Sequence, residues 1–210
     1  WEKDGPRHRL RTPGGTLTAD KVIIATNGFT RDKLHPGVAG TLLPALSNII
    51  VTRQMSDAEV ARHNWVTECP VWNTRTLVFY YRMIQGNRFM LGARAATRNT
   101  EAATETYRRW LIERFHEMWP EWRDIDIEYF WRGFVCLSAA RVPHIGELPE
   151  SPGVWHAFGY HGGGVGWATY SGQAVARLIA GNEPAENWLS PVVRSQLRRF
   201  PLPWMRLWYL

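Results

Sequence analysis

The chain has 210 residues, of which 45% are hydrophobic and 21% charged, so its composition is that of an ordinary globular protein. This balance excludes disordered, collagen-like and coiled-coil classes. Its 25 Lys and Arg residues outnumber the 19 Asp and Glu residues, giving a net charge of +6. Cys69 and Cys136 form no Cys-x-x-Cys pattern, which argues against a disulfide scaffold or a zinc site. We therefore expect no zinc or other metal site and a cytoplasmic location. We also expect no membrane span.

The first part of the chain carries signals for strands and turns. Alternating residues around Pro13-Gly14-Gly15 predict a hairpin, and the β-branched run 21–26 predicts a strand buried on both faces of a parallel sheet. Residues 49–53 predict a further strand. Ser56 and Glu59 have the spacing of a capping box, which predicts that a short helix begins there.

The middle of the chain predicts an antiparallel sheet with a helix. Runs 77–83 and 88–93 flank a turn sequence and indicate a hairpin. Apolar residues recur at helical spacing over 101–118, which predicts an amphipathic helix ended by a proline. Residues 125–134 predict a long strand with a disturbance at Gly133.

A strand, a glycine loop and a helix follow in close succession. Residues 154–158 predict a buried strand, 159–166 form a glycine-rich loop, and a helix is expected from Trp167 to Ala180 with Gly181 at its C-cap. Glycines allow a ligand to approach the backbone, and a helix N-terminus attracts negative charge. A tight turn that packs a helix on a sheet would have a similar composition. We expect Gly163 and Gly164 to occupy backbone angles that side chains rarely adopt.

The strand 22–28 and the glycine loop together resemble the FAD-dependent oxidoreductases of the D-amino-acid oxidase type. In that family a similar strand lies beside the cofactor and a late glycine loop faces the flavin ring. The hairpin 77–92 and the stretch 127–146 are similar to the gamma-glutamylputrescine oxidoreductase-like branch. The resemblance implies an enzyme that oxidises a small amine or amino acid to an imine, with FAD as cofactor of the full-length protein.

The resemblance also implies which residues form the site. It assigns the cofactor to Ala25, Thr26, Gly28, Gly159, Gly162, Gly163, Gly164 and Val165. The loop N–H groups would stabilise negative charge on the reduced flavin. His161, Tyr80 and Arg82 are the candidate catalytic residues. Arg82, Arg94, Arg132 and Arg141 are candidates to bind a substrate carboxylate, although a structural ion pair is the more frequent role of any one arginine.

The resemblance implies an α+β fold: an antiparallel substrate-domain sheet with a helix layer, plus part of a Rossmann-like FAD-binding domain of the GR2 type. The expected domains are 1–46, partial FAD-binding; 47–138, substrate-binding; 139–185, a return to FAD-binding; and 186–210, a tail with Trp204, Arg206, Trp208 and Tyr209.

Two departures from the family pattern are visible. The N-terminal Gly-x-Gly-x-x-Gly unit is absent and the chain opens at Trp1, so we expect a fragment whose partner is the missing N-terminal FAD-binding half. His161 stands where the family usually has Ser or Thr, and Gly163 where it usually has His.

Two other functions are consistent with the composition. The +6 charge and 12 tryptophans would suit a non-catalytic basic, aromatic binding module. The arginines are spread along the chain, so we expect no nucleic-acid partner. A relic that keeps the flavoprotein fold without its cofactor is the second alternative. The family resemblance also raises a covalent flavin tether at Cys136, as a cysteine forms in some sarcosine-oxidase-like relatives, but the spacing to Arg141 and Pro143 does not match and a buried apolar cysteine is the more frequent role.

Overall fold

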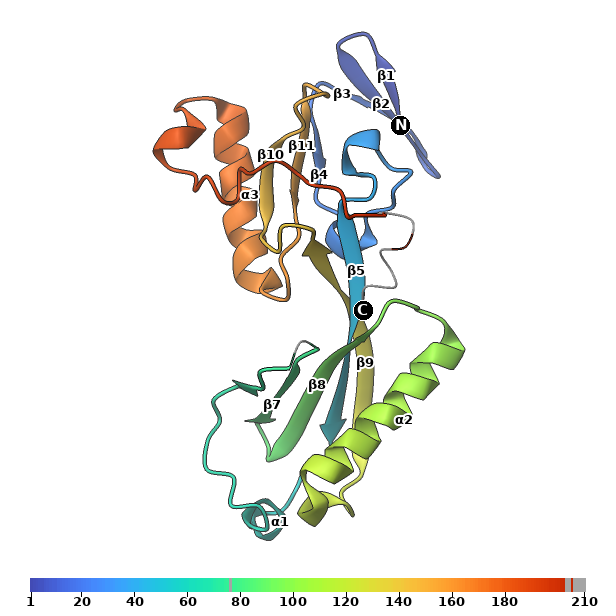
Figure 1. Cartoon of the computed structure of the whole chain (residues 1–210), viewed down its shortest axis with the longest axis vertical. Helices are drawn as coiled ribbons and strands as arrows, with labels where there is room; N and C mark the ends of the chain where they lie inside the picture. Colours follow the sequence, from blue (N-terminus) through green and yellow to red (C-terminus); the bar gives the residue numbers. More distant parts are fainter. Residues whose placement is uncertain (76, 203–204, 206–210) are drawn as a thin grey trace. The chain divides into compact units, whose positions relative to one another are not determined.

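The computed structural model describes residues 1–75, 77–202 and 205. The chain forms two compact units, whose helices and strands are labelled in Figure 1. The first unit contains residues 1–44 and 135–202, and the second contains residues 45–134. The tail residues Trp204, Arg206, Trp208 and Tyr209 lie outside the described part of the chain.

The second unit is built on a five-stranded sheet in the order β6-β7-β8-β5-β9. Its strands are β6 (Val71–Trp72), β7 (Phe79–Ile84), β8 (Arg88–Ala96), β5 (Leu42–Thr52) and β9 (Ile127–Ser138). The pairs β6–β7, β7–β8 and β8–β5 are antiparallel, which confirms the expected hairpin and sheet. The disturbance expected at Gly133 does not interrupt the strand, because β9 runs through this residue.

Helix α2 (Glu101–Met118) covers one face of this sheet and has the bounds that its periodicity predicts (Figure 1). Thr100 caps it by accepting a hydrogen bond from the Ala103 amide. Leu111 and Phe115 are fully buried and pack in a core with sheet residues such as Phe89. Burial of this apolar stripe, rather than intrinsic helix propensity, fixes the helix on the sheet.

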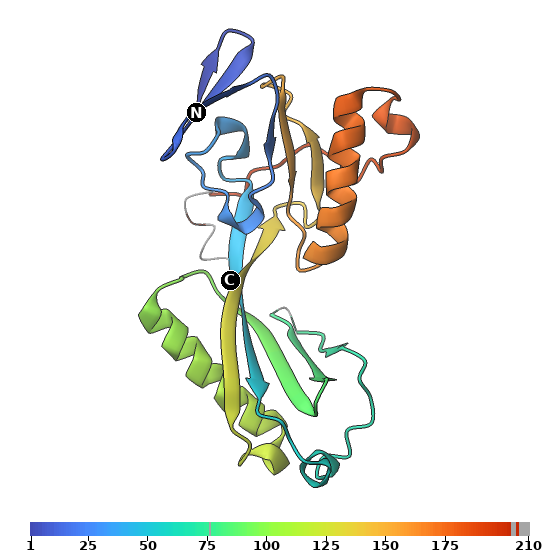
Figure 2. The same cartoon turned by 180° about the vertical axis from the view of Figure 1, so that it is seen from behind.

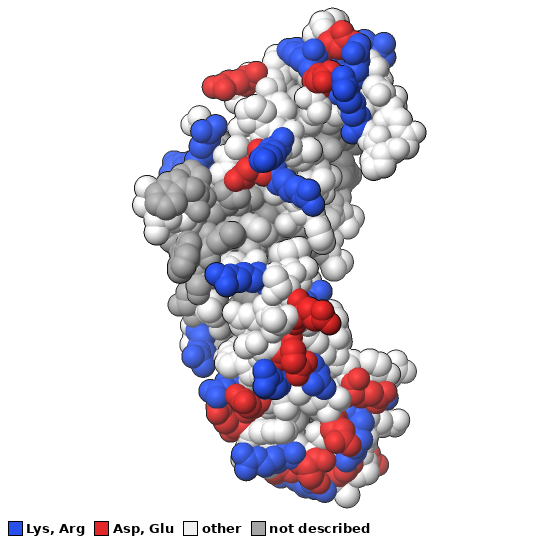
Figure 3. Space-filling model, turned by 90° about the vertical axis from the view of Figure 1, so that its right-hand side faces the viewer, with Lys and Arg blue, Asp and Glu red and all other residues white. Residues whose placement is uncertain are grey.

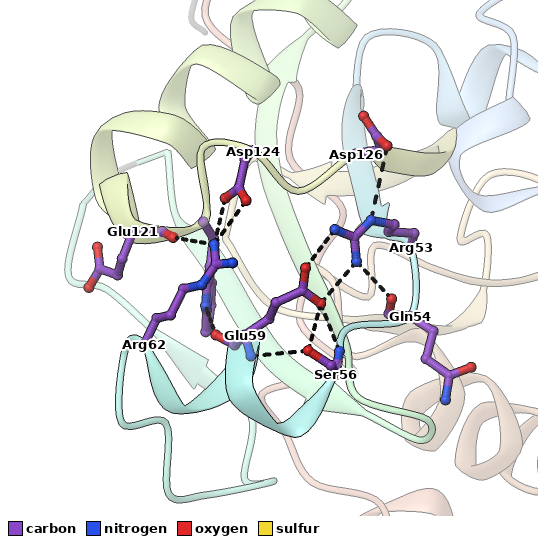
Figure 4. Close-up of polar contacts among 9 residues, drawn as sticks. Arg53, Gln54, Ser56, Glu59, Arg62, Glu121, Asp124 and Asp126 are labelled. Carbon is purple, nitrogen blue, oxygen red and sulfur yellow. Dashed lines mark hydrogen bonds and ion pairs between the residues drawn. The ribbon is translucent and has the colours of Figure 1, made fainter.

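Charged side chains tie α1 (Asp57–Ala61) to neighbouring segments of the second unit (Figure 4). Ser56 and Glu59 form the expected capping box. Arg53 donates to Glu59 over 2.8 Å, and this hydrogen bond is the main reason that the pKa of Glu59 falls to about 2. Arg62 donates to Asp124 over 2.7 Å. The Arg53–Glu59 pair is part-buried and the Arg62–Asp124 pair is exposed. Exposed pairs add little stability, but both pairs fix the orientation of the helix.

The first unit contains two three-stranded sheets. One is the antiparallel sheet β1 (Glu2–Asp4), β2 (Arg7–Thr12) and β3 (Gly15–Ala19), seen clearly in Figure 2, with the expected hairpin between β2 and β3. The other has the order β10-β11-β4, with β10 at His144–Glu147, β11 at Val154–Phe158 and β4 at Val22–Ile24. β4 and β11 are parallel and share no sheet with β7. This separation agrees with the sequence, in which β4 is a continuous apolar run whereas the strands of the second unit alternate.

The expectation that the β4 run is buried on both faces is wrong. Ile24 is 2% exposed and lies in a core with Val154 and Phe158, whereas Ile23 is 49% exposed. Neighbouring residues of a strand point to opposite faces of the sheet. Because the described chain packs on only one face at β4, Ile24 is buried and Ile23 is not.

Helix α3 (Gly164–Ala180) packs on β10 and β11 through a core that includes Ile145, Ala157 and Val175. It begins three residues before the expected Trp167, because Trp167 already donates its amide to Gly163 and so closes the first turn. Gly181 ends the helix in the left-handed conformation (φ 66°), as its C-cap position predicts. Short 3-10 turns occur at η1 (Asn27–Phe29), η2 (Pro36–Val38), η3 (Pro120–Trp122) and η4 (Ala185–Asn187).

The surface shows no segregation of charge on the face drawn in Figure 3, where basic and acidic side chains are interspersed. No helix among the described residues is long and apolar enough to cross a membrane. Within the same part of the chain, no group of three or more His, Cys, Asp and Glu residues could hold a metal ion.

Candidate functional site

The loop between β11 and α3 has an unusual backbone. Gly159 and Gly162 have φ angles of 79° and 101°, which side chains rarely adopt. His161 between them also has a positive φ of 52°, although it carries a side chain. A non-glycine residue held in this region is strained by about 1–3 kcal/mol, and such strain is concentrated at functional sites.

The expectation for Gly163 and Gly164 is wrong on this point. Gly163 has φ −83°, and Gly164 is the first residue of α3. A Cβ on Gly163 would come within 2.9 Å of Cδ1 of Trp167, whereas a Cβ on Gly164 would meet no atom within 4 Å. The absence of a side chain at these two positions therefore matters for space and not for backbone angle.

Hydrogen bonds hold the loop to two other segments of the first unit. The His161 amide donates to the Cys136 carbonyl over 3.1 Å. The Gly159 amide donates to Oδ1 of Asn27 over 3.1 Å. The second bond joins the glycine loop to the turn after β4, so the two stretches singled out in the sequence meet in space. Asn27 was not among the candidate residues; its place beside a glycine at the end of a strand is the signal that could have identified it.

The candidate residues after β4 lie around this turn. Ala25 and Thr26 are exposed, and the Thr26 hydroxyl hydrogen-bonds that of Thr30 over 2.7 Å. Gly28 is buried within η1. Ala25 and Thr26 could therefore contact a ligand directly, whereas Gly28 serves the turn that carries them.

The start of α3 offers backbone amides that lie outside the helical ladder. Trp167 makes the first intrahelical bond, so the amides of Gly164, Val165 and Gly166 precede that ladder. Val165 is 91% exposed, and a Cβ on Gly166 would meet no atom within 4 Å. Gly163 differs, because its amide donates to the Tyr160 carbonyl over 2.9 Å. The open amides and the helix dipole form a place suited to an electron-rich group.

An apolar recess of about 750 Å³ lies beside this helix start. It is lined by Gly163, Gly166, Trp167 and Tyr170 of the loop and helix, and by residues such as Pro143. The recess and the open amides place apolar and polar recognition side by side within the first unit.

Tyr80 lies in a polar cluster on the sheet of the second unit. Its hydroxyl hydrogen-bonds the Ser47 hydroxyl over 2.8 Å. Burial raises the pKa of Tyr80, against the opposing effects of that bond and of Arg94. Burial also lowers the pKa of Arg94, while Tyr80 raises it. The cluster thus holds a neutral phenol close to a half-buried guanidinium.

The candidate arginines differ in their surroundings. Arg82 is half-buried and donates a hydrogen bond to the Met83 carbonyl over 3.4 Å. It lies on the same sheet face as Tyr80, because residues i and i+2 of a strand point to the same side. Arg132 donates to Asn48 and Thr104 over 2.8 and 2.6 Å, which makes it a structural clamp. Arg141 is exposed in a turn, with φ 59°.

Cys136 is buried in the core with Ile24 and Phe158, as expected of an apolar cysteine. Burial raises the pKa of its thiol to about 12. A thiol in this state is a poor nucleophile, which argues against a covalent tether at this position.

Comparisons with known proteins identify a matching family and similar folds. The sequence model of the family described as FAD dependent oxidoreductase (DAO) matches residues 1–178. Gamma-glutamylputrescine oxidoreductase of Escherichia coli is 27% identical over 82% of this chain and 39% of its own length. The probable oxidoreductase OrdL of Rhizobium meliloti is 31% identical over 86% of this chain and 40% of its own length. The chain therefore spans about two fifths of these curated relatives.

The fold is also similar to solved structures. Glycine oxidase from Geobacillus kaustophilus superposes with a TM-score of 0.70 and 23% identity, over 94% of this chain and 50% of that one. L-proline dehydrogenase from P. horikoshii gives a TM-score of 0.64 over 86% of this chain and 48% of that one. The α+β fold expected from the sequence, with part of a Rossmann-like domain, is confirmed.

Proposed function

Because the chain belongs to the family of FAD-dependent oxidoreductases, we propose that it forms part of an enzyme that oxidises the C–N bond of a small amine or amino acid to an imine. The observation that carries the proposal is the glycine loop of the first unit, whose strained backbone ends in the open amides of α3. The kinds of substrate named for the relatives, a gamma-glutamyl amine and glycine, support this substrate class.

The residues of the first unit fit the cofactor. When bound, FAD accepts a hydride equivalent from the carbon beside the substrate nitrogen. Gly164, Val165 and Gly166 offer amides and open space to an electron-rich ring edge. Gly159 and Gly162 give the loop the positive φ angles that expose those amides. Ala25 and Thr26 reach the same neighbourhood through the bond between Asn27 and Gly159.

The second unit is proposed to orient the substrate. Tyr80 and Arg82 share one face of β7, and Arg94 lies near enough to Tyr80 to influence its pKa. A guanidinium beside a neutral phenol suits a substrate carboxylate, with Arg94 or Arg82 as the cation. The proposed domains follow from these roles: FAD-binding at 1–46 and 139–185, and substrate-binding at 47–138.

The proposed partner of this chain is an N-terminal FAD-binding half. The first unit exposes apolar side chains that such a half would cover, since Ile23 is 49% and Val165 is 91% exposed. Trp167 and Tyr170 extend this apolar surface along α3.

The test is made on the complete gene product. We expect a bound flavin, seen in its visible absorption, and bleaching of that absorption when a small amine or amino acid is added without oxygen. A panel of gamma-glutamyl amines, glycine, sarcosine and proline distinguishes the substrate class. Flavin that binds but is reduced by no member of the panel would contradict the activity. A folded protein without flavin would support the relic instead.

A further inference from the structure

We propose that His161 is a positioning residue that holds the glycine loop on the end of β9. Its imidazole is neutral, carries its proton on Nδ1, and accepts a hydrogen bond from the Ser138 amide at Nε2. The arrangement belongs to the first unit alone. It rests on the proposed function and deepens it by assigning His161 to loop geometry and not to proton transfer.

The hydrogen bonds around Ser138 identify the acceptor. The Ser138 amide points at Nε2 of His161 over 3.1 Å. The Ser138 hydroxyl donates to the Val142 carbonyl over 2.7 Å and accepts from the Val142 amide over 3.3 Å. The hydroxyl also lies 3.2 Å from Nε2, but its proton is already used. Nε2 is therefore the group that satisfies the Ser138 amide.

This assignment determines the tautomer. An amide donor requires a lone pair on Nε2, so the ring proton of the neutral imidazole is on Nδ1. A proton on Nε2 would face the Ser138 N–H, and Ser138 is 1% exposed, so no solvent would compensate the amide. A general acid or base acting through Nε2 would have to break this bond in every cycle.

The backbone of His161 adds a second attachment to the same strand. Its amide donates to the Cys136 carbonyl over 3.1 Å, two residues before Ser138. Main chain and side chain together thus connect one loop residue to two buried positions of β9. These two bonds offset the cost of the positive φ at His161 and fix the direction in which Gly162 leads into α3.

Two substitutions separate the acceptor from the titratable group. In His161→Gln the side-chain amide oxygen takes the position of Nε2 and accepts the hydrogen bond from the Ser138 amide. The glutamine side chain does not titrate. In His161→Asn the side chain is too short for that bond, although asparagine tolerates a positive φ better than most residues. Asparagine therefore controls for backbone strain.

The first measurement is independent of flavin. Long-range ¹H–¹⁵N NMR of the chain at neutral pH should show the His161 ring, assigned by the loss of its signals in His161→Asn, as the Nδ1–H tautomer. Amide exchange at Ser138 should be slow in the parent and in His161→Gln, and at least tenfold faster in His161→Asn. An Nε2–H or doubly protonated ring, or equal exchange in all three proteins, would overturn the inference.

The second measurement uses the flavin-loaded complete gene product. Amine-dependent flavin reduction in His161→Gln should stay within threefold of the parent, and in His161→Asn it should fall at least tenfold. Equal loss in both variants, with Ser138 still protected in His161→Gln, would show a proton-transfer role and overturn the inference. If the parent is not reduced by any amine, the proposed function fails, and the NMR and exchange results still decide the role of His161.

Discussion

The ring of Tyr80 lies against the backbone of Gly92 on the neighbouring strand, so close that a Cβ at Gly92 would overlap three atoms of the phenol. The hydroxyl of Tyr80 thereby reaches across β8 to Ser47 on β5. One missing side chain thus positions a phenol over three strands of the second unit.

Gly92→Ala should displace Tyr80 and destabilise the protein by about 1–3 kcal/mol, as overpacking in a filled site does. Gly133→Ala is the matched control, because a Cβ at this position in β9 would meet no atom within 4 Å, and it should change stability by less than about 0.5 kcal/mol. Urea unfolding measures both. Equal midpoints for the two variants would show that the Tyr80 ring moves aside at little cost.

Gly164→Val should slow flavin reduction in the complete gene product by at least about tenfold, or about 1.4 kcal/mol, because the new side chain enters the open space at the start of α3. Gly172→Val is the control: it also lies in α3, with nothing within 4 Å of its Cβ. Stopped-flow absorbance gives the rates, and circular dichroism checks the fold. A parental rate in a folded, flavin-loaded Gly164→Val protein would make the loop a packing turn.

Stability should fall in mild acid through His156. Burial lowers the pKa of His156 from 6.5 to about 4, and the charge of the nearby His144 contributes a smaller part of this shift. Because the unfolded chain binds this proton more readily, stability is full above pH 6.5, declines as the pH falls towards 4, and then levels off, with a total loss of about 3 kcal/mol. Denaturant midpoints at several pH values measure the decline. His156→Leu should flatten the curve, and an unchanged slope in that variant would assign the effect elsewhere.

The two thiols should react very differently at pH 8. Cys69 is exposed, whereas Cys136 is buried with its pKa raised to about 12. A disulfide reagent should therefore modify one thiol in the native protein and two in denaturant. Cys69→Ser should abolish the native reaction. Rapid native labelling of Cys136 in that variant would show that the core around it opens readily.

Short-range sequence patterns were sufficient to predict several elements of this fold. The capping box at Ser56 and Glu59, the helix 101–118 and the C-cap at Gly181 depend on residues within a few positions of one another, and the structure shows each of them. The segregation of continuous and alternating apolar runs likewise assigned β4 and β7 to different sheets.

Tertiary structure decided what depends on contacts between distant residues. Ile23 is half exposed because burial depends on what covers a face, which β-branched composition does not specify. Asn27 reaches Gly159 across 132 positions of sequence, and Ser138 reaches His161 across 23. A hydrogen bond has no signature in a sequence until folding brings its donor and acceptor within about 3 Å. The sequence therefore identified the glycine loop and its family, while the attachments that give the loop its shape appeared only in three dimensions.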